Sequence, residues 1–474
     1  MPSFSDCSSL TKTDEASPRR TLGLREAVSL IVGIVVGAGI FKAPAIVAGL
    51  TGRADLMFAV WILGGLISII GALCYAELAA TYPSAGGDYH FLHRAYGRSV
   101  AFLFGWARLS VITTGSIALL SFVFGDYMAH VLPLGQLFPG QAPLIYATLA
   151  ILVLTLLNRF NVHTGMTAQT WLTLLQAFSL LLIIGTAAFL LSSPGGAEVD
   201  LVHTRPTLEA AAPTFSAFGL AMVFVLLTYG GWNESAYISA EVKGGRNSLL
   251  YALVLSILII TLLYLLVNWA FWSSLGLAGM AQSNAVAADL LRLAFGPMAE
   301  KLISLMVAIS ALTSINATII VGARTSYALG RDWPVLSLLG VWDRRRDTPV
   351  NALWMQCAGA LLLVFVGYWI GGGFKSMVEF TAPVFWFFFL LTGIALFVLR
   401  IRDPDAERPF RVPFYPVLPV LFCLSCAYML YSSLSYVYDQ SLGGINAAWI
   451  GVIVLATGVI ILLFVRSVGQ SDAP

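Results

Sequence analysis

Long apolar segments dominate this sequence and limit what it can fold into. Hydrophobic residues make up 58% of the 474 residues and charged residues only 11%, whereas a soluble domain carries about 25% charged residues. A helix that crosses a bilayer needs roughly 20 mainly apolar residues. We therefore predict an all-α membrane protein with twelve transmembrane helices. The apolar segments lie near residues 27–49, 56–77, 99–131, 142–158, 168–191, 213–239, 248–275, 299–328, 350–371, 376–400, 415–437 and 446–466.

The basic residues between these segments predict the orientation of the chain. Of the 26 Lys and Arg, we assign 19 to the side of both termini and five to the other side. The positive-inside rule then places both termini in the cytoplasm, and we expect a multi-pass protein of the cell inner membrane. Residues 1–20 are polar, so we expect a disordered cytoplasmic tail and no cleavable signal peptide. The five basic residues assigned to the outer side are Arg53, Arg205, Arg292, Lys301 and Lys375.

Sequence motifs for covalent or nucleotide-driven chemistry are absent. The chain has no G-x-x-x-x-G-K-[ST] loop, no H-E-x-x-H and no pair of C-x-x-C motifs. Its five cysteines are scattered along the sequence, and we interpret them as packing residues rather than metal ligands or disulfide partners. We therefore expect no enzyme activity, no cofactor, no metal site and no nucleic-acid partner.

Two of the apolar segments are interrupted in their middle by closely spaced glycines. Gly37 and Gly39 break the first segment, and Gly230 and Gly231 break the sixth. Irregular backbone persists in a bilayer only where it is buried in protein or lines a cavity. Two such breaks in corresponding segments indicate the binding site of a secondary transporter. The alternative interpretation is that the glycines only allow close helix packing.

Each break is expected to expose backbone groups that suit an α-amino acid. The half-helix after the first break presents the N–H groups of Ala38 and Gly39, at its positive end, to a carboxylate. The half-helices that end at the breaks present the carbonyl groups of Val35, Leu227 and nearby Gly230. These carbonyl groups suit an ammonium group or an alkali ion. A carboxylate site beside an ammonium site predicts that the protein binds an amino acid.

Four motifs resemble those of the amino acid–polyamine–organocation (APC) superfamily, and within it the L-type amino acid transporter branch and its bacterial relatives. The resemblance implies a LeuT-type fold with two inverted five-helix repeats, and alternating access around a site at mid-membrane. It implies a transport core over residues 21–400, with repeats near 24–192 and 213–400, followed by two peripheral helices and a short tail over 401–474. The motifs are Gly37–Phe41, Glu77–Tyr89, Tyr229–Asn233 and Arg408–Pro413.

The resemblance also assigns residues to the substrate site. It implies that the substrate carboxylate lies on the N–H groups of Ala38 and Gly39, and the ammonium on the three carbonyl groups named above. Trp232 directly follows the second break and is expected to form part of the pocket wall. The predicted substrate-binding residues are Val35, Gly37, Ala38, Gly39, Leu227, Tyr229, Gly230, Gly231 and Trp232.

Three further residues, Gln176, Thr313 and Ser314, bear on whether an ion is coupled to transport. Many relatives carry a lysine in the fifth segment where this chain has Gln176, and a glutamine cannot titrate. Thr313 and Ser314 resemble, in position, the hydroxyl residues of sodium-coupled members of the wider fold, which makes them candidates for a sodium site. The carbonyl groups of Gly33 and Val36 would complete it. The alternative, which we favour, is that both hydroxyl groups bond back to their own helix.

Ionisable residues inside apolar segments suggest function by default, because burying charge in a membrane is unfavourable. Lys42 either favours anionic or polar substrates, acts as an outer gate, or extends into an outer water-filled vestibule. Glu234 is a candidate proton carrier if burial raises its pKa. Arg108 either faces an anionic substrate or forms an ion pair, and we favour the ion pair. Its candidate partners are Glu77, Glu234 and Glu379.

Taken together, these patterns predict a transporter of uncharged L-amino acids that works by alternating access, most simply as an amino acid exchanger. A sodium- or proton-coupled symporter is the alternative in the same class, and a non-transporting amino acid sensor is the alternative in another class. The expected partners are the substrate and the lipid bilayer. Residues 130–143 contain no cysteine, so a disulfide-linked glycoprotein partner is not indicated, and we expect a monomer or a homodimer.

Overall fold

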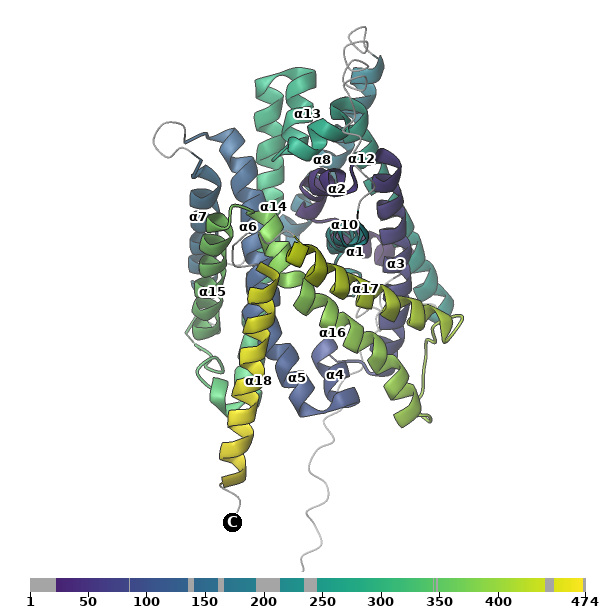
Figure 1. The fold of residues 1–474 in the computed structure, drawn as a ribbon, viewed down its shortest axis with the longest axis vertical. Helices are drawn as coiled ribbons and strands as arrows, with labels where there is room; N and C mark the ends of the chain where they lie inside the picture. The colour runs from purple at the N-terminus through teal and green to yellow at the C-terminus, as the bar shows by residue number, and fades with distance from the viewer. Residues whose placement is uncertain are drawn as a thin grey trace, which may run out of the picture.

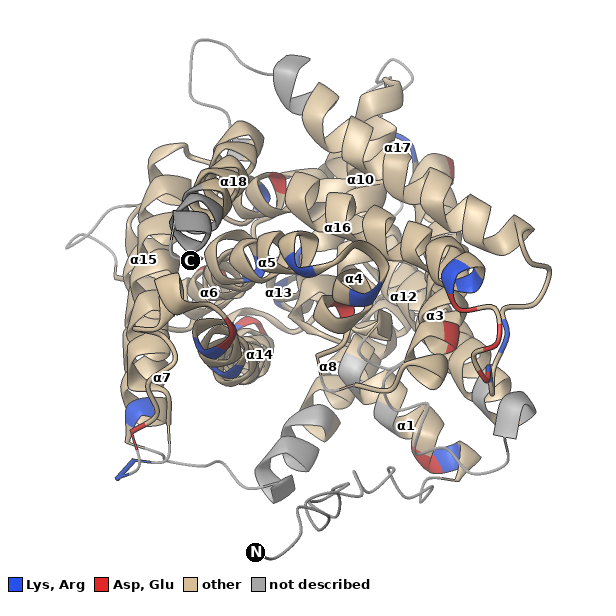
Figure 2. Cartoon of the chain, turned by 90° about the horizontal axis from the view of Figure 1, so that it is seen from below, with Lys and Arg blue, Asp and Glu red and all other residues tan. Residues whose placement is uncertain are grey.

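The computed structural model is an assembly of helices (Figure 1). It describes residues 23–84, 86–134, 140–160, 166–192, 214–233, 245–343, 345–346, 348–439 and 447–471. In this part of the chain, nine helices are long and apolar enough to cross a membrane. Figure 2, a view from one end of the molecule, shows few charged residues on a mainly uncharged ribbon. The prediction of an all-α membrane protein is therefore confirmed in its coarse form.

Each predicted apolar segment contains at least one helix. Two further apolar helices, Phe215–Thr228 and Ala448–Leu463, are shorter than the nine long spans. The helices in the first five segments are α1 (Leu24–Val35), η1 (Ala38–Phe41), α2 (Ala43–Thr51), α3 (Ala54–Thr81), α5 (Arg98–Ala107), η2 (Arg108–Ile112), α6 (Thr113–Val131), α7 (Ala142–Arg159) and α8 (Met166–Ser192). Those in the other segments are α10 (Phe215–Thr228), α12 (Gly245–Gln282), α14 (Pro297–Asp332), α15 (Val350–Trp369), α16 (Phe374–Arg402), α17 (Val417–Asp439) and α18 (Ala447–Ser471).

The two interrupted helices, α1 and α10, lie at the centre of the assembly (Figure 1). α1 packs against α12, and α10 packs against α2, α3 and α17. Glycines on α3 permit this close approach, because a Cβ atom on Gly64 would overlap the side chain of Val225 on α10. A Cβ atom on Gly71 would lie 2.6 Å from the indole ring of Trp232. The core is therefore built around the segments that carry the breaks.

Two short helices that the apolar pattern does not predict occupy similar places before long helices. α4 (Asp88–Tyr96) ends at Gly97, with φ 88° and ψ −179°, and α5 follows directly. α13 (Val286–Phe295) ends at Gly296, with φ 79° and ψ −169°, and α14 follows directly. Positive φ favours glycine at both caps. Figure 1 places α4 and α13 at opposite ends of the molecule.

A bidentate ion pair ties the α4 end of the molecule together. Arg400 donates from Nε and Nη2 to the two carboxylate oxygens of Glu77, at 2.7 and 2.6 Å. The backbone N–H of Val412 donates to the same carboxylate at 2.6 Å. Arg400 also lies 3.7 Å from the ring centroid of Tyr415. Glu77 is thus committed to the scaffold that holds α3, α16 and the segment before α17.

Candidate functional site

The first break separates two helical pieces of the first apolar segment. α1 ends at Val35, Val36 and Gly37 are extended, and η1 begins at Ala38. The first N–H groups of a helical segment have no acceptor within it. Within the described residues, no hydrogen bond uses the N–H of Ala38 or Gly39 as a donor. This break therefore presents two free N–H groups at the start of η1.

The second break lies against the first. α10 ends at Thr228, and the chain turns through Tyr229 and Gly230 to Gly231, which has φ 101°. A Cβ atom on Gly39 would lie 3.3 Å from the Thr228 Oγ1 atom, so the missing side chain lets the two breaks approach closely. The carbonyl group of Leu227 accepts a hydrogen bond from the N–H of Gly230 at 3.1 Å.

Tyr264 on α12 connects the two breaks, and the sequence analysis missed it. Its hydroxyl oxygen lies 3.3 Å from the Val35 carbonyl oxygen and 3.1 Å from the Thr228 carbonyl oxygen. The predicted ammonium acceptor Val35 therefore already has a donor in this structure. The available signal was a tyrosine in the middle of an apolar segment, because a buried tyrosine hydroxyl usually requires a hydrogen-bond partner.

An aromatic cluster holds Tyr264 in place. Tyr229 donates from its hydroxyl group to the carbonyl oxygen of Trp61 at 3.1 Å, and the Tyr229 and Tyr264 rings are 5.0 Å apart. The Trp61 and Tyr264 rings are 5.6 Å apart and nearly perpendicular, at 78°. Tyr229, predicted as a substrate-binding residue, thus packs away from the cavity described next.

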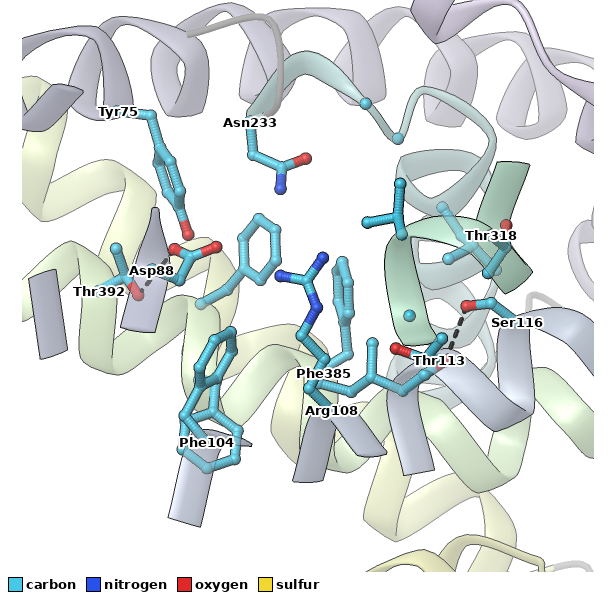
Figure 3. A pocket seen from close by; sticks show the side chains of 18 of the residues that line it. Tyr75, Asp88, Phe104, Arg108, Thr113, Ser116, Asn233, Thr318, Phe385 and Thr392 are labelled. Carbon is cyan, nitrogen blue, oxygen red and sulfur yellow. Dashed lines mark hydrogen bonds between the residues drawn. The ribbon is translucent and has the colours of Figure 1, made fainter. Parts of the chain in front are cut away.

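A cavity of about 300 Å³ adjoins the second break. Its apolar wall includes four phenylalanine rings, and its two charged side chains come from α4 and η2 (Figure 3). Of the predicted site residues, Leu227, Gly230, Gly231 and Arg108 line the cavity. The other lining residues are Tyr75, Asp88, Phe104, Ile112, Thr113, Ser116, Asn233, Ala317, Thr318, Val321, Gly322, Phe385, Phe388, Phe389 and Thr392.

Trp232 lies behind the cavity wall rather than in it. Its ring is 5.3 Å from the ring of Tyr75 and 5.5 Å from that of Phe389, both of which line the cavity. Val35, Gly37, Ala38 and Gly39 are also absent from the lining residues. The cavity therefore reaches the second break directly, whereas the first break lies beyond its wall.

Lys42 lies on the other side of the breaks and is held in a buried ion pair. Its Nζ atom is 2.6 Å from the Asp126 Oδ2 atom and 2.7 Å from the carbonyl oxygen of Asn284. Next to it, Tyr127 donates from its hydroxyl group to the carbonyl oxygen of Phe41 at 2.8 Å. These contacts join the segment after the first break to α6 and to the chain before α13. The side chain of Lys42 is only 8% exposed, and together with Asp126 it lines a pocket of about 340 Å³ on this side.

The candidate sodium ligands make local hydrogen bonds. Thr313 donates to the carbonyl oxygen of Ile309 at 3.0 Å, and Ser314 donates to that of Ser310 at 3.2 Å. Both are bonds to the preceding turn of α14, which is the alternative that the sequence analysis favours. In the part of the chain that the structure describes, no cluster of His, Cys, Asp or Glu could hold a metal ion.

Gln176 and Arg108 are the remaining coupling candidates among the described residues. The Gln176 Nε2 atom is buried and has no hydrogen-bond partner within the described residues. Glu234 lies outside the described residues. The expected ion pair between Arg108 and Glu77 or Glu379 is wrong, because Glu77 pairs with Arg400 and Glu379 lies 3.8 Å from Lys375.

Comparison of the sequence with known protein families identifies the family of this chain. The family described as amino acid permease matches residues 22–468 of the chain. The chain belongs to this family. The resemblance to the APC superfamily is thereby confirmed, and members of this family are transporters rather than enzymes.

Curated relatives match this permease over most of its length. It is 30% identical over 414 residues to the b(0,+)-type amino acid transporter 1 of Homo sapiens. This alignment covers 87% of the permease and 82% of the relative. It is 28% identical over 444 residues to the cystine/glutamate transporter of Homo sapiens, covering 93% and 84%. It is 27% identical over 457 residues to the Asc-type amino acid transporter 1 of Mus musculus, covering 94% and 81%.

Proposed function

We propose that this permease moves L-amino acids across the cell inner membrane by alternating access and works as an amino acid exchanger. The relatives are amino acid transporters by name. The observation that carries the proposal is the contact between the two breaks, where free N–H groups and helix carbonyl ends meet beside a cavity. Opposite partial charges at one place suit a zwitterion.

In this proposal the backbone holds the common part of every substrate. The N–H groups of Ala38 and Gly39 hold the carboxylate, and the carbonyl groups of Leu227, Gly230 and Val35 hold the ammonium. The Val35 carbonyl becomes available when the ammonium displaces the hydroxyl group of Tyr264. Gly37 and Gly231 provide the breaks, while Tyr229 and Trp232 support the site from behind. Uncharged L-amino acids remain the expectation from the sequence.

The two sides of the breaks differ in a way that supports alternating access. On one side a cavity bounded by α4 and η2 reaches the second break, and on the other the buried pair of Lys42 and Asp126 joins the helices. The positive-inside rule puts the α4 end in the cytoplasm. The described conformation then corresponds to a carrier that faces inward, with Lys42 serving as the outer gate.

We further infer that the twelve segments form two inverted repeats, with a core over residues 21–400 and two peripheral helices over residues 401–474. The matched pair of α4 and α13 supports this inference. Both are short, both end at a glycine with positive φ, both precede a long helix, and they lie at opposite ends of the molecule (Figure 1). Both termini are then cytoplasmic, and the protein is a monomer or a homodimer.

The contacts of the candidate ion-coupling residues support exchange without a coupled ion. Thr313 and Ser314 bond to their own helix, and Gln176 carries no charge. Lys42 is occupied by Asp126. A proton-coupled mode would therefore depend on Glu234, and a sodium-coupled mode would require Thr313 and Ser314 to break their present bonds and join Gly33 and Val36.

Uptake by purified permease in proteoliposomes tests the proposal. A panel of labelled amino acids is offered to vesicles with and without internal amino acid, in sodium and in choline, at two external pH values. We expect uptake only with internal amino acid, independent of sodium and pH. Concentrative uptake into empty vesicles that requires sodium or low pH would establish symport instead. Saturable binding with no flux under any condition would establish a sensor.

A further inference from the structure

Arg108 reaches into the cavity from an unusual piece of helix. It is the first residue of η2, a π-helical turn that interrupts the long helix formed by α5 and α6. Such turns are rare and often occur at functional sites. Figure 3 shows the side chain extending into the cavity, with its guanidinium group directed toward Asn233.

This guanidinium group has no partner within the described residues. No hydrogen bond and no ion pair within 4.0 Å involves Arg108 there, whereas Lys42, Arg94 and Arg400 each have an acidic partner. A charged group inside a membrane protein is unfavourable unless it is paired or faces a water-filled cavity. Arg108 satisfies the second condition.

The acidic residue in the same cavity is compensated locally. Asp88 accepts a hydrogen bond from the Thr392 Oγ1 atom at 3.2 Å and is the first residue of α4, where the positive end of the helix stabilises a carboxylate. The Asp88 carboxylate is therefore stabilised without Arg108. Of the two charged side chains that line the cavity, the Arg108 guanidinium group is the one for which the described residues supply no partner.

We propose that Arg108 binds the side-chain carboxylate of an acidic amino acid and thereby selects substrates with net charge −1. This rests on the proposed function, in which the two breaks hold the α-amino and α-carboxyl groups. The cavity touches the break at Leu227, Gly230 and Gly231 and presents Arg108 from η2. A planar guanidinium group matches a carboxylate with two parallel hydrogen bonds. The proposal replaces the expectation of uncharged substrates.

The test compares isosteric substrates on the purified permease in proteoliposomes. Exchange of L-glutamate and L-glutamine, and of L-aspartate and L-asparagine, is measured for wild type, Arg108→Gln and Arg108→Lys. Wild type should favour the acid over its amide by about tenfold or more, since an unpaired buried group penalises a substrate that cannot pair with it. Arg108→Gln should lose that preference, mainly through slower exchange of the acid, and Arg108→Lys should keep part of it.

Arg98→Gln is the matched control, because it removes a guanidinium group ten residues earlier in the chain. The Arg98 guanidinium group lies over the ring of Trp333, 5.5 Å from the ring centroid, and Arg98 does not line the cavity. The variant should leave the preference unchanged. Two results would overturn the inference while leaving the proposed function intact. In the first, wild type exchanges glutamine but not glutamate. In the second, Arg108→Gln favours the acid over its amide as strongly as wild type does. Exchange of no amino acid at all would overturn the proposed function.

A structural role for Arg108 predicts a different pattern. If Arg108→Gln loses exchange of every amino acid and adding Glu234→Gln restores it, the guanidinium group pairs with Glu234 and does not select substrates. A wild type that prefers L-lysine, with the preference abolished by Asp88→Asn, would assign the cavity to basic side chains. Either result overturns the inference.

Discussion

The hydroxyl oxygen of Tyr264 lies 3.3 Å from the carbonyl oxygen of Val35, so a side chain on α12 covers the end of the first half-helix. The same hydroxyl group lies 3.1 Å from the last carbonyl oxygen of α10. It has a single hydrogen to share between two negative helix ends. A substrate ammonium offers three donors and a positive charge, and is therefore the stronger partner for these carbonyl groups.

Replacing Tyr264 with phenylalanine should destabilise the substrate-free protein selectively. Two buried carbonyl groups lose their shared donor, which costs about 1–3 kcal/mol. A substrate that supplies its own donors should restore this stability, so the rise in Tm on adding substrate should exceed that of wild type, and KM should not increase. Thermal unfolding in detergent, with and without substrate, measures both effects.

Tyr146→Phe is the control for this change, because Tyr146 also donates to a carbonyl group, that of Leu132 at the end of α6, away from both breaks. It should lower Tm equally with and without substrate. A KM for Tyr264→Phe that rises about tenfold, equal to about 1.4 kcal/mol, would show instead that the hydroxyl group itself contacts the substrate.

The pair of Lys42 and Asp126 should show strong energetic coupling. Lys42→Met or Asp126→Leu alone leaves the other charge buried and should lower the free energy of unfolding by about 3–5 kcal/mol. The double variant removes both charges and should lose less than either single variant. A double-mutant cycle of thermal stability in detergent measures the coupling. Simple additivity of the two single changes would contradict this prediction.

Gly39→Ala should impair transport by separating the two breaks. Its new Cβ atom would lie 3.3 Å from the Thr228 Oγ1 atom, and overpacking of this kind typically costs 1–3 kcal/mol. Thr228→Ala removes the two opposing side-chain atoms, Oγ1 and Cγ2, so the double variant should recover exchange that Gly39→Ala loses. Initial exchange rates in proteoliposomes test this. If Thr228→Ala does not improve the Gly39→Ala protein, the contact is not what limits transport.

Acid should weaken the connection between α4 and the end of α16. Hydrogen bonds from Arg94, at 3.0 Å, and from the hydroxyl group of Tyr82, at 3.1 Å, lower the pKa of Asp403 below its usual value of 3.8. The stabilisation is complete above the unfolded-state pKa and is lost as pH falls through the lower folded-state pKa. Because the Asp403 side chain is partly exposed, the effect should be small and should decrease with added salt.

Asp403→Asn provides the comparison. Its Tm should lie below that of wild type at pH 6, and the two values should converge as the pH falls below about 4. Thermal unfolding in detergent as a function of pH and salt measures the difference. A difference that persists unchanged at pH 3 would show that the carboxylate charge contributes nothing to this connection.

The sequence predicts the features that depend on local composition. Apolar segments of sufficient length become helices because the bilayer requires internal backbone hydrogen bonds, and clustered glycines at 37–39 and 230–231 interrupt two of them. The short helices α4 and α13 escape an apolar-segment analysis because they are only nine and ten residues long. Their terminal glycines, Gly97 and Gly296, are the local signal that could have located their ends.

Features that depend on which helices meet are harder to predict. Glu77 and Arg108 are plausible partners by sequence, but Arg400 lies beside Glu77 in the fold. The role of Tyr264 arises only where α1, α10 and α12 meet. No amino-acid pattern marks the π-helical turn that carries Arg108. Such a turn results from one extra residue in a helix rather than from a residue type.

The buried pair of Lys42 and Asp126 also bears on the kinetics of the empty carrier. Opening that side separates two charges that are now 2.6 Å apart and largely shielded from water. We expect this step to have a high activation barrier when no substrate is bound to offset it. An empty carrier would then reorient slowly, and slippage without a returning substrate would be rare. Tight stoichiometry between entering and leaving amino acids would follow from one ion pair, without any coupling ion.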